Sequence, residues 1–195
     1  RARRPDIKLL AYVTSHNIWD PSGPDSMVHY PTRYYRMVRD LGAWLYNTSG
    51  TEFSMNRVNL AKRDLFGRFV LAEGLADLFR EVIIVPGIWD GIFMDVYCKT
   101  ILWMETPSER IDYQRAGYPT REAFDAAWGA AIDTLGNRVR RYAGPNFLMV
   151  GNCTAGQNYA VFNGWMRENF PWQNGGSWYS NMYREPGGLF NDDRN

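Results

Sequence analysis

The chain has 195 residues, enough for one domain with a substantial hydrophobic core. Its 22 basic and 21 acidic residues nearly cancel, so its charge gives no support to a general attraction to nucleic acid or to a membrane surface. The longest apolar runs, such as residues 82–85, are far too short to span a bilayer. No signal peptide is visible, but the first residue is not methionine. The location is therefore open, with a secreted or extracellular protein as one alternative.

Aromatic residues are the unusual part of the composition. Phe, Trp and Tyr make up 15% of the chain, with 8 Trp and 12 Tyr. Sugars have apolar C–H faces and hydroxyl edges, which suit an aromatic ring beside a hydrogen-bonding group. Such rings also fill cores and interfaces, and we divide the excess roughly in half between these two uses.

Cysteines and histidines give little sign of a cofactor. Cys98 and Cys153 match no metal or redox spacing. Each follows a predicted strand, so a disulfide is one alternative, but two free buried thiols are favoured. His16 and His29 are the only histidines, and no ligand cluster surrounds either. We expect no metal and no organic cofactor.

The first third of the chain alternates between apolar runs and turns. Residues 8–15 predict a strand that is buried on both faces. A polar loop, 17–26, follows it. Residues 34–38 then lead into the turn signature Arg-Asp-Leu-Gly at 39–42. After the apolar residues 43–46, residues 55–60 predict another short strand.

Two helices carry the clearest periodicity. Residues 63–82 and 121–142 repeat apolar side chains at three- and four-residue steps. Thr120 can cap the start of the second helix, and Gly144 stands where a C-terminal cap belongs. Apolar runs that predict further strands follow at 91–96, at 147–150 and, less regularly, at 165–170.

Strands that alternate with helices predict parallel βαβ units. An eight-stranded barrel and an open doubly wound sheet both fit this pattern. No Gly-rich dinucleotide or phosphate loop follows any strand, which disfavours a nucleotide-binding open sheet. Polar residues gather at the predicted carboxyl ends of the strands, where barrels place functional groups. These residues are Ser15, His16, Asn17, Asn59, Asp95, Asn152 and Glu168.

We therefore predict an α/β fold, a single (β/α)8 TIM-barrel-like domain over residues 1–195. A complete barrel usually needs about 250 residues, so this one is expected to be incomplete, missing its first strand and its last two. Residues 91–96, 147–150 and 165–168 should be neighbouring parallel strands in that order, with their carboxyl ends on one face.

The central motif is Gly-Ile-Trp-Asp-Gly-Ile-Phe-Met-Asp-Val-Tyr at residues 87–97. Asp95 follows three apolar strand residues, and burying a carboxylate there is costly without a purpose or partners. At a carboxyl end it would point into a barrel mouth. The alternative is a structural carboxylate, and the motif alone leaves about even odds. The Asp90-Gly91 pair favours a turn at the entry to the strand.

A second carboxylate, Glu168, ends the apolar run that begins at Trp165. One long helix and one strand separate it from Asp95, which fits two βα units and two carboxylates that face each other. Glycoside hydrolysis needs two such groups, one to protonate the leaving oxygen and one to attack the anomeric carbon or activate water. Taken alone, Glu168 could equally be a solvated charge at the end of a strand.

Several motifs resemble known glycoside hydrolases. Residues 89–95 resemble the D-G-[IV]-F-[LM]-D strand of glycoside hydrolase family 114 (endo-α-1,4-polygalactosaminidase-like), and even more the related hypothetical glycosyl hydrolase family 15. Residues 150–152 and 164–168 resemble the next two strands, which end in Asn and in the family's Glu. Further similar stretches are 8–13, 30–42 and 59–60, so the resemblance covers roughly 8–170. Two departures are Cys153, where Gly is frequent, and Tyr30, which separates His29 from Pro31.

The resemblance implies a barrel whose fourth-strand and sixth-strand carboxylates, here Asp95 and Glu168, do the chemistry on an α-linked sugar or amino-sugar polymer. Asp95 would be the nucleophile or base, and Glu168 the acid. The expected sugar contacts are His16, Asn17, Asn59, Tyr97, Asn152, Trp165 and Trp172. The alternative is a non-catalytic carbohydrate-binding or structural protein on the same scaffold. No nucleic-acid or membrane partner is expected, and the oligomeric state is open.

Overall fold

The structure is a computed structural model that describes residues 6–18, 30–53, 57–153 and 158–166. The chain divides into two units, Arg1–Trp165 and Met166–Asn195, and the fold described below is that of the first. Its elements are β1 (Leu10–Thr14), α1 (Tyr30–Leu41), α2 (Val70–Phe79), the π-helical turn η2 (Arg80–Ile84), β2 (Gly91–Asp95), the 3-10 turn η3 (Leu102–Met104), α3 (Arg121–Ala143), β3 (Leu148–Gly151) and β4 (Gly164–Trp165).

The strands form one parallel sheet in the order β1-β2-β3-β4. The predicted order of the last three strands is confirmed, because β2, β3 and β4 are adjacent and parallel. Thr14 pairs with Asp95 at one end of β2, and Gly91 pairs with Leu148 at the other. The carboxyl ends of the strands therefore lie along one edge of the sheet. The predicted continuation of β4 to Glu168 lies outside the described residues.

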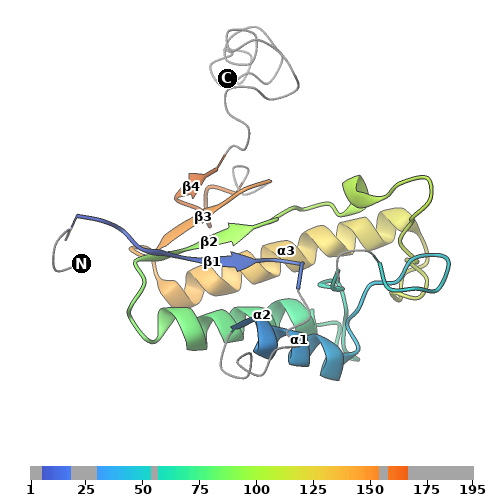
Figure 1. Cartoon of the computed structure of the whole chain (residues 1–195), viewed down its shortest axis with the longest axis horizontal. Helices are drawn as coiled ribbons and strands as arrows, with labels where there is room; N and C mark the ends of the chain where they lie inside the picture. Colours follow the sequence, from blue (N-terminus) through green and yellow to red (C-terminus); the bar gives the residue numbers. More distant parts are fainter. Residues whose placement is uncertain (1–5, 19–29, 54–56, 154–157, 167–195) are drawn as a thin grey trace, which may run out of the picture. The chain divides into compact units, whose positions relative to one another are not determined.

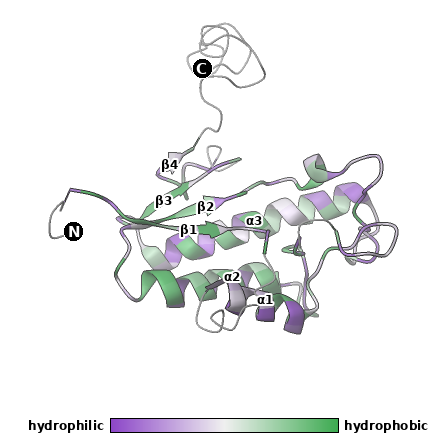
Figure 2. Ribbon diagram, viewed as in Figure 1, coloured by the Kyte–Doolittle hydropathy of each residue, from purple (hydrophilic) through white to green (hydrophobic). Residues whose placement is uncertain are grey.

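One face of the sheet packs against the helices (Figure 1). Alternation along the strands turns the buried side chains of Val13, Met94 and Met149 to this face. In Figure 2 the strands and α2 are mostly green, which matches an apolar layer between them. The opposite face carries Tyr12, which is 62% exposed, beside the half-buried Phe93. The core therefore lies on one side of the sheet only.

Helix α3 matches its prediction at both ends. The Thr120 side chain accepts a hydrogen bond from the Ala123 backbone N–H at 3.1 Å. Gly144 ends the helix with a φ of 73°, a left-handed conformation that glycine adopts without a steric penalty. The buried stripe of α3 packs against the core through residues such as Trp128, Leu135 and Val139.

The helix predicted for residues 63–82 begins only at Val70. Residues before it form a turn, because the Asp64 carboxylate accepts backbone N–H groups of Phe66 and Arg68, each at 2.9 Å. Gly67 completes this turn with a φ of 79°. A short polar side chain that binds nearby backbone competes with helix formation, and here it wins.

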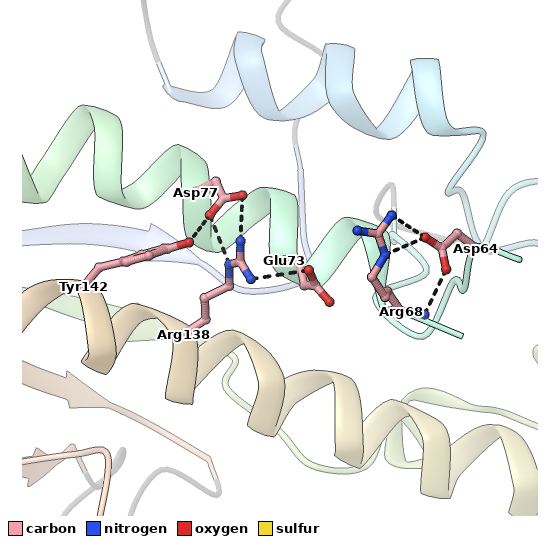
Figure 3. A network of polar contacts seen from close by, with 6 residues as sticks. All are labelled: Asp64, Arg68, Glu73, Asp77, Arg138 and Tyr142. Atoms are coloured by element: carbon pink, nitrogen blue, oxygen red, sulfur yellow. Dashed lines mark hydrogen bonds and ion pairs between the residues drawn. The ribbon is translucent and has the colours of Figure 1, made fainter. Parts of the chain in front are cut away.

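Figure 3 shows the polar contacts that connect α2 to α3. The Arg138 guanidinium donates to Asp77 at 3.0 Å and to Glu73 at 3.4 Å, and the Tyr142 hydroxyl also donates to Asp77. A separate ion pair joins Arg68 to Asp64. The contacts to Asp77 and Glu73 set the register of two helices whose adhesion comes mainly from buried apolar residues.

The strand predicted for residues 55–60 is wrong as a member of the sheet. Arg57 and Val58 form only isolated antiparallel bridges, with Asn17 and Trp44. As a result β1 pairs directly with β2, although two helices and this bridged segment lie between them in the sequence. The described residues therefore form an open four-stranded α/β sheet and not a closed barrel.

The close packing of β2 against β3 at Gly91 can be tested by substitution. A Cβ at this position would collide with the carbonyl oxygen of Leu148, which is backbone and cannot move aside. We predict that Gly91→Ala lowers the free energy of unfolding by about 1–3 kcal/mol in urea denaturation. Gly164→Ala is the matched control, because its Cβ would meet Val150 at an ordinary 3.5 Å. Equal effects of the two substitutions would contradict the packing described here.

Candidate active site

Asp95 stands at the carboxyl end of β2 with its side chain held by three donors. The Val96 backbone N–H donates to Oδ1 at 2.8 Å, the Asn152 side chain donates to the same oxygen, and the Tyr12 hydroxyl donates to Oδ2. These donors come from three adjacent segments, at β1, β2 and the end of β3. Donors that converge on a half-buried aspartate suit a carboxylate, and they fix its orientation.

Aromatic rings and a small cavity lie beside this carboxylate. Tyr12 and Phe93 are register partners on the open face of the sheet, and their rings stack with centroids 5.7 Å apart. Tyr12 also lines a cavity of about 210 Å³ together with Thr14, Asn17 and Tyr30. Asn17 thus lines a cavity together with Tyr12, the residue that donates to Asp95. The arrangement offers a ring face and hydrogen-bonding groups together.

The backbone is strained directly after both polar strand ends. Val96 has a φ of 50° and Cys153 a φ of 56°, the left-handed region that side chains rarely adopt. For a β-branched residue such as Val96 the cost is of order 1–3 kcal/mol. Such strain persists only where surrounding contacts impose it. Here it turns the Val96 N–H back onto Asp95.

The two cysteines correct the prediction of free thiols. Cys98 and Cys153 form a disulfide, with their Cα atoms 5.2 Å apart. The loops after β2 and β3 are neighbours because the two strands pair, and each cysteine lies in one of these loops. The disulfide therefore connects the loop after Asp95 to the residue that follows Asn152.

Two buried polar residues, His16 and Arg57, lie close to the carboxyl end of β1. His16 is fully buried, its ring meets the edge of Trp128, and its Nδ1 lies 3.4 Å from the Arg57 guanidinium. Burial, and then the Arg57 charge, lower the pKa of His16 to about 3. Burial also lowers the pKa of Arg57 to about 10. The Nε2 atom of His16 has no hydrogen-bond partner among the described residues. His16 was predicted to contact sugar, but it supports the edge from within the core.

The remaining predicted sugar contacts are scattered. Tyr97 is a core residue and not a stacking platform, because its buried hydroxyl donates to the Ile132 carbonyl at 2.8 Å. Asn59 lines a second, larger cavity. Trp165 ends β4 and is 42% exposed. Glu168 and Trp172 lie outside the described residues.

Two residues of the edge escaped the sequence reasoning. Tyr12 alternates with the buried Ala11 and Val13, so the strand pattern places it on the other face, but only the register brings it to Asp95. Arg57 lies between Asn56 and Val58 in the segment predicted as a strand, which gives no sign that its side chain is buried. Among the described residues no group of three or more His, Cys, Asp or Glu could hold a metal ion. In the same part of the chain, no helix is long and apolar enough to cross a membrane.

Replacing both cysteines tests the disulfide. The bond spans 55 residues of sequence, and closing a loop of this size stabilises a fold by about 4 kcal/mol in the chain-entropy relation. We predict that Cys98→Ser with Cys153→Ser lowers the free energy of unfolding by about 2–4 kcal/mol. A reductant should reproduce this loss in the wild type and leave the double variant unchanged. An unaltered urea midpoint in the double variant would refute the linkage.

The lowered pKa of His16 makes the stability of the protein depend on pH. The folded protein keeps this imidazole neutral down to about pH 3, whereas in the unfolded chain it gains a proton near 6.5. Between these pH values the unfolded state binds more protons than the folded state. The contribution of His16 to stability therefore falls by about 1.4 kcal/mol per pH unit as pH drops. We expect His16→Gln to flatten the curve of unfolding free energy against pH below 6.5. Parallel curves for variant and wild type would exclude this role.

Comparison with protein families places this chain in a known family. No curated protein matches the chain. The sequence model of the family described as hypothetical glycosyl hydrolase family 15 matches residues 1–186, nearly the whole chain. The strand that ends in Asp95, the Asn152 that holds it and the segment up to Glu168 all fall inside this match. The chain therefore belongs to hypothetical glycosyl hydrolase family 15.

Proposed function

We propose that this protein hydrolyses an α-linked sugar or amino-sugar polymer, with Asp95 as the nucleophile or base and Glu168 as the acid. The observation that carries the proposal is the Asp95 carboxylate, oriented by Tyr12, Val96 and Asn152 at the carboxyl edge of a parallel sheet. Membership of a glycosyl hydrolase family supports a carbohydrate substrate. The aromatic pair on the open face supports the same substrate class.

In this proposal the two carboxylate oxygens of Asp95 have different tasks. Oδ1 accepts from both Val96 and Asn152, so it anchors the side chain. Oδ2 accepts only from the Tyr12 hydroxyl among the bonds described, which leaves it the more available oxygen. Oδ2 would attack the anomeric carbon or take a proton from the attacking water. Tyr12 and Asn152 then steady the position of the carboxylate through the reaction.

The second carboxylate comes from the segment after β4. Glu168 lies outside the described residues, so its proposed role as the acid rests on the sequence motif at residues 164–168 and on the family match. A separation of about 5–5.5 Å between the carboxyl groups would make the enzyme retaining, and about 6.5–9.5 Å would make it inverting.

Substitution of each carboxylate tests the proposal. We expect Asp95→Asn and Glu168→Gln each to reduce hydrolysis across a panel of α-linked glycans by at least about a thousandfold, while glycan binding persists. Both changes keep the size and shape of the side chain, so folding should be retained.

Asp90→Asn is the matched control for these variants. Asp90 stands in the same motif, but its carboxylate accepts the Leu9 backbone N–H at 2.8 Å, at the amino end of the sheet. Hydrolysis should therefore survive this change. Normal turnover by either carboxylate variant would refute that residue's role. Tight glycan binding without any cleavage by the wild type would instead identify a carbohydrate-binding protein.

A further inference from the structure

A second cavity, of about 510 Å³, lies away from the Asp95 cluster. Three segments line it, residues 42–46, 59–63 and 115–118. In Figure 1 the loops coloured cyan and yellow-green, which supply parts of its wall, lie on the side toward which the strand arrows point. The cavity therefore belongs to the same end of the sheet as Asp95.

Three cations line this cavity: Lys62, Arg63 and Arg115. No aspartate or glutamate is among its lining residues. Lys62 donates to the Gly42 carbonyl at 3.0 Å, Arg63 to that of Gly67 and Arg115 to that of Gly50, the last two at 3.4 Å. Within the described part of the chain, none of the three forms an ion pair with a carboxylate.

Several other cations of the fold form ion pairs with carboxylates, in contrast to these three. Arg33 pairs with Glu81, Arg121 with Glu105 and Lys99 with Asp133, all within 2.9 Å. The two acids nearest to the cavity in sequence accept hydrogen bonds from other groups than the three cationic side-chain ends. Asp64 binds the Arg68 guanidinium, and Asp112 accepts the Arg115 backbone N–H at 2.9 Å. The three cations thus give the cavity a positive charge that no lining carboxylate compensates, which would attract an anion.

The rest of the cavity wall suits a sugar ring. Trp44, Tyr46 and Tyr118 contribute aromatic surface, and the Arg115 guanidinium lies 3.3 Å from the centroid of the Tyr46 ring. Asn59 is 4% exposed, and its Oδ1 has no hydrogen-bond partner among the described residues.

The backbone connects this cavity to the catalytic edge. Asn59 follows Val58, whose N–H donates to the His16 carbonyl at 3.3 Å. The neighbouring Ser15 N–H donates to the carbonyl of Asp95 at 3.0 Å. Backbone hydrogen bonds through residues 15 and 16 thus join the segment of Asn59 to the strand end at Asp95.

We infer that this cavity binds an anionic sugar residue, a uronate or another sugar that carries acidic oxygens. The inference rests on the proposed hydrolase function and narrows its substrate class. The carboxylate would meet the ends of Lys62 and Arg115, and the sugar ring would lie against Trp44. A free amino sugar, which is cationic, would be repelled at this subsite.

Calorimetric titration of the full chain tests the inference. The probes are an α-linked oligogalacturonide, the neutral galactose oligomer of equal length, the corresponding galactosamine oligomer and inorganic phosphate. We expect the oligogalacturonide to bind at least about tenfold tighter than the neutral oligomer, because charge-assisted hydrogen bonds are added. This preference should shrink as salt concentration rises. Phosphate that binds as tightly as the oligogalacturonide would show an anion site without sugar recognition and would overturn the inference.

The matched variants remove the same kind of charge inside and outside the cavity. Lys62→Gln, Arg63→Gln and Arg115→Gln combined should abolish the preference for the acidic oligomer. Arg141→Gln, on the exposed side of α3, should keep it. Circular dichroism and the urea midpoint report whether the triple variant is folded. If it is not, the single variants and the salt dependence of the wild type decide the outcome.

The failure of this inference and that of the proposed function are distinguishable. An acidic oligomer bound through the three cations but never cleaved would refute the hydrolase function and leave the anionic subsite standing. Cleavage of neutral glycans that depends on Asp95, with no preference for acidic ones, would refute the subsite and leave the hydrolase function.

Discussion

The register of the parallel sheet is the constraint on which the rest of this structure depends. Met94 pairs with Gly151 and Thr14 with Asp95, so the residues that follow β1 and β3 are brought to either side of the Asp95 side chain. A shift of one residue would turn Asp95 to the helix face and Met94 to the open face. The hydrogen bond from Asn152 to Asp95 is a direct consequence of this register.

Holding the Asp95 carboxylate at this place costs free energy, and neighbouring features of the fold add to that cost. Val96 is strained, and His16 and Arg57 are buried with little access to water. The disulfide between the two loops and the apolar layer under α2 and α3 supply compensating stability. Strain and buried polar groups concentrate at functional edges more often than elsewhere, because a purely structural edge can relax them.

In the proposed function, the Asp95 end of the sheet and the cationic cavity have different tasks. Near Asp95 the groups are neutral donors and rings, which orient a sugar without competing for the carboxylate. At the cavity the groups are Lys62, Arg63 and Arg115, whose charges act over a longer distance. A polymer with acidic units would be drawn to the protein by the second group and positioned by the first.

Local patterns in the sequence were enough to determine helix α3 with both of its caps, the strand that ends in Asp95 and the strand that precedes Asn152. Each of these depends on periodicity or on a capping residue within a few positions. The tertiary structure alone decided that Tyr12 meets Asp95, that His16 and Tyr97 are buried and that Cys98 reaches Cys153. These features depend on which distant segments become neighbours. Pairing of strands and burial of side chains are set by the packing of the whole core, and no short stretch of sequence contains that information.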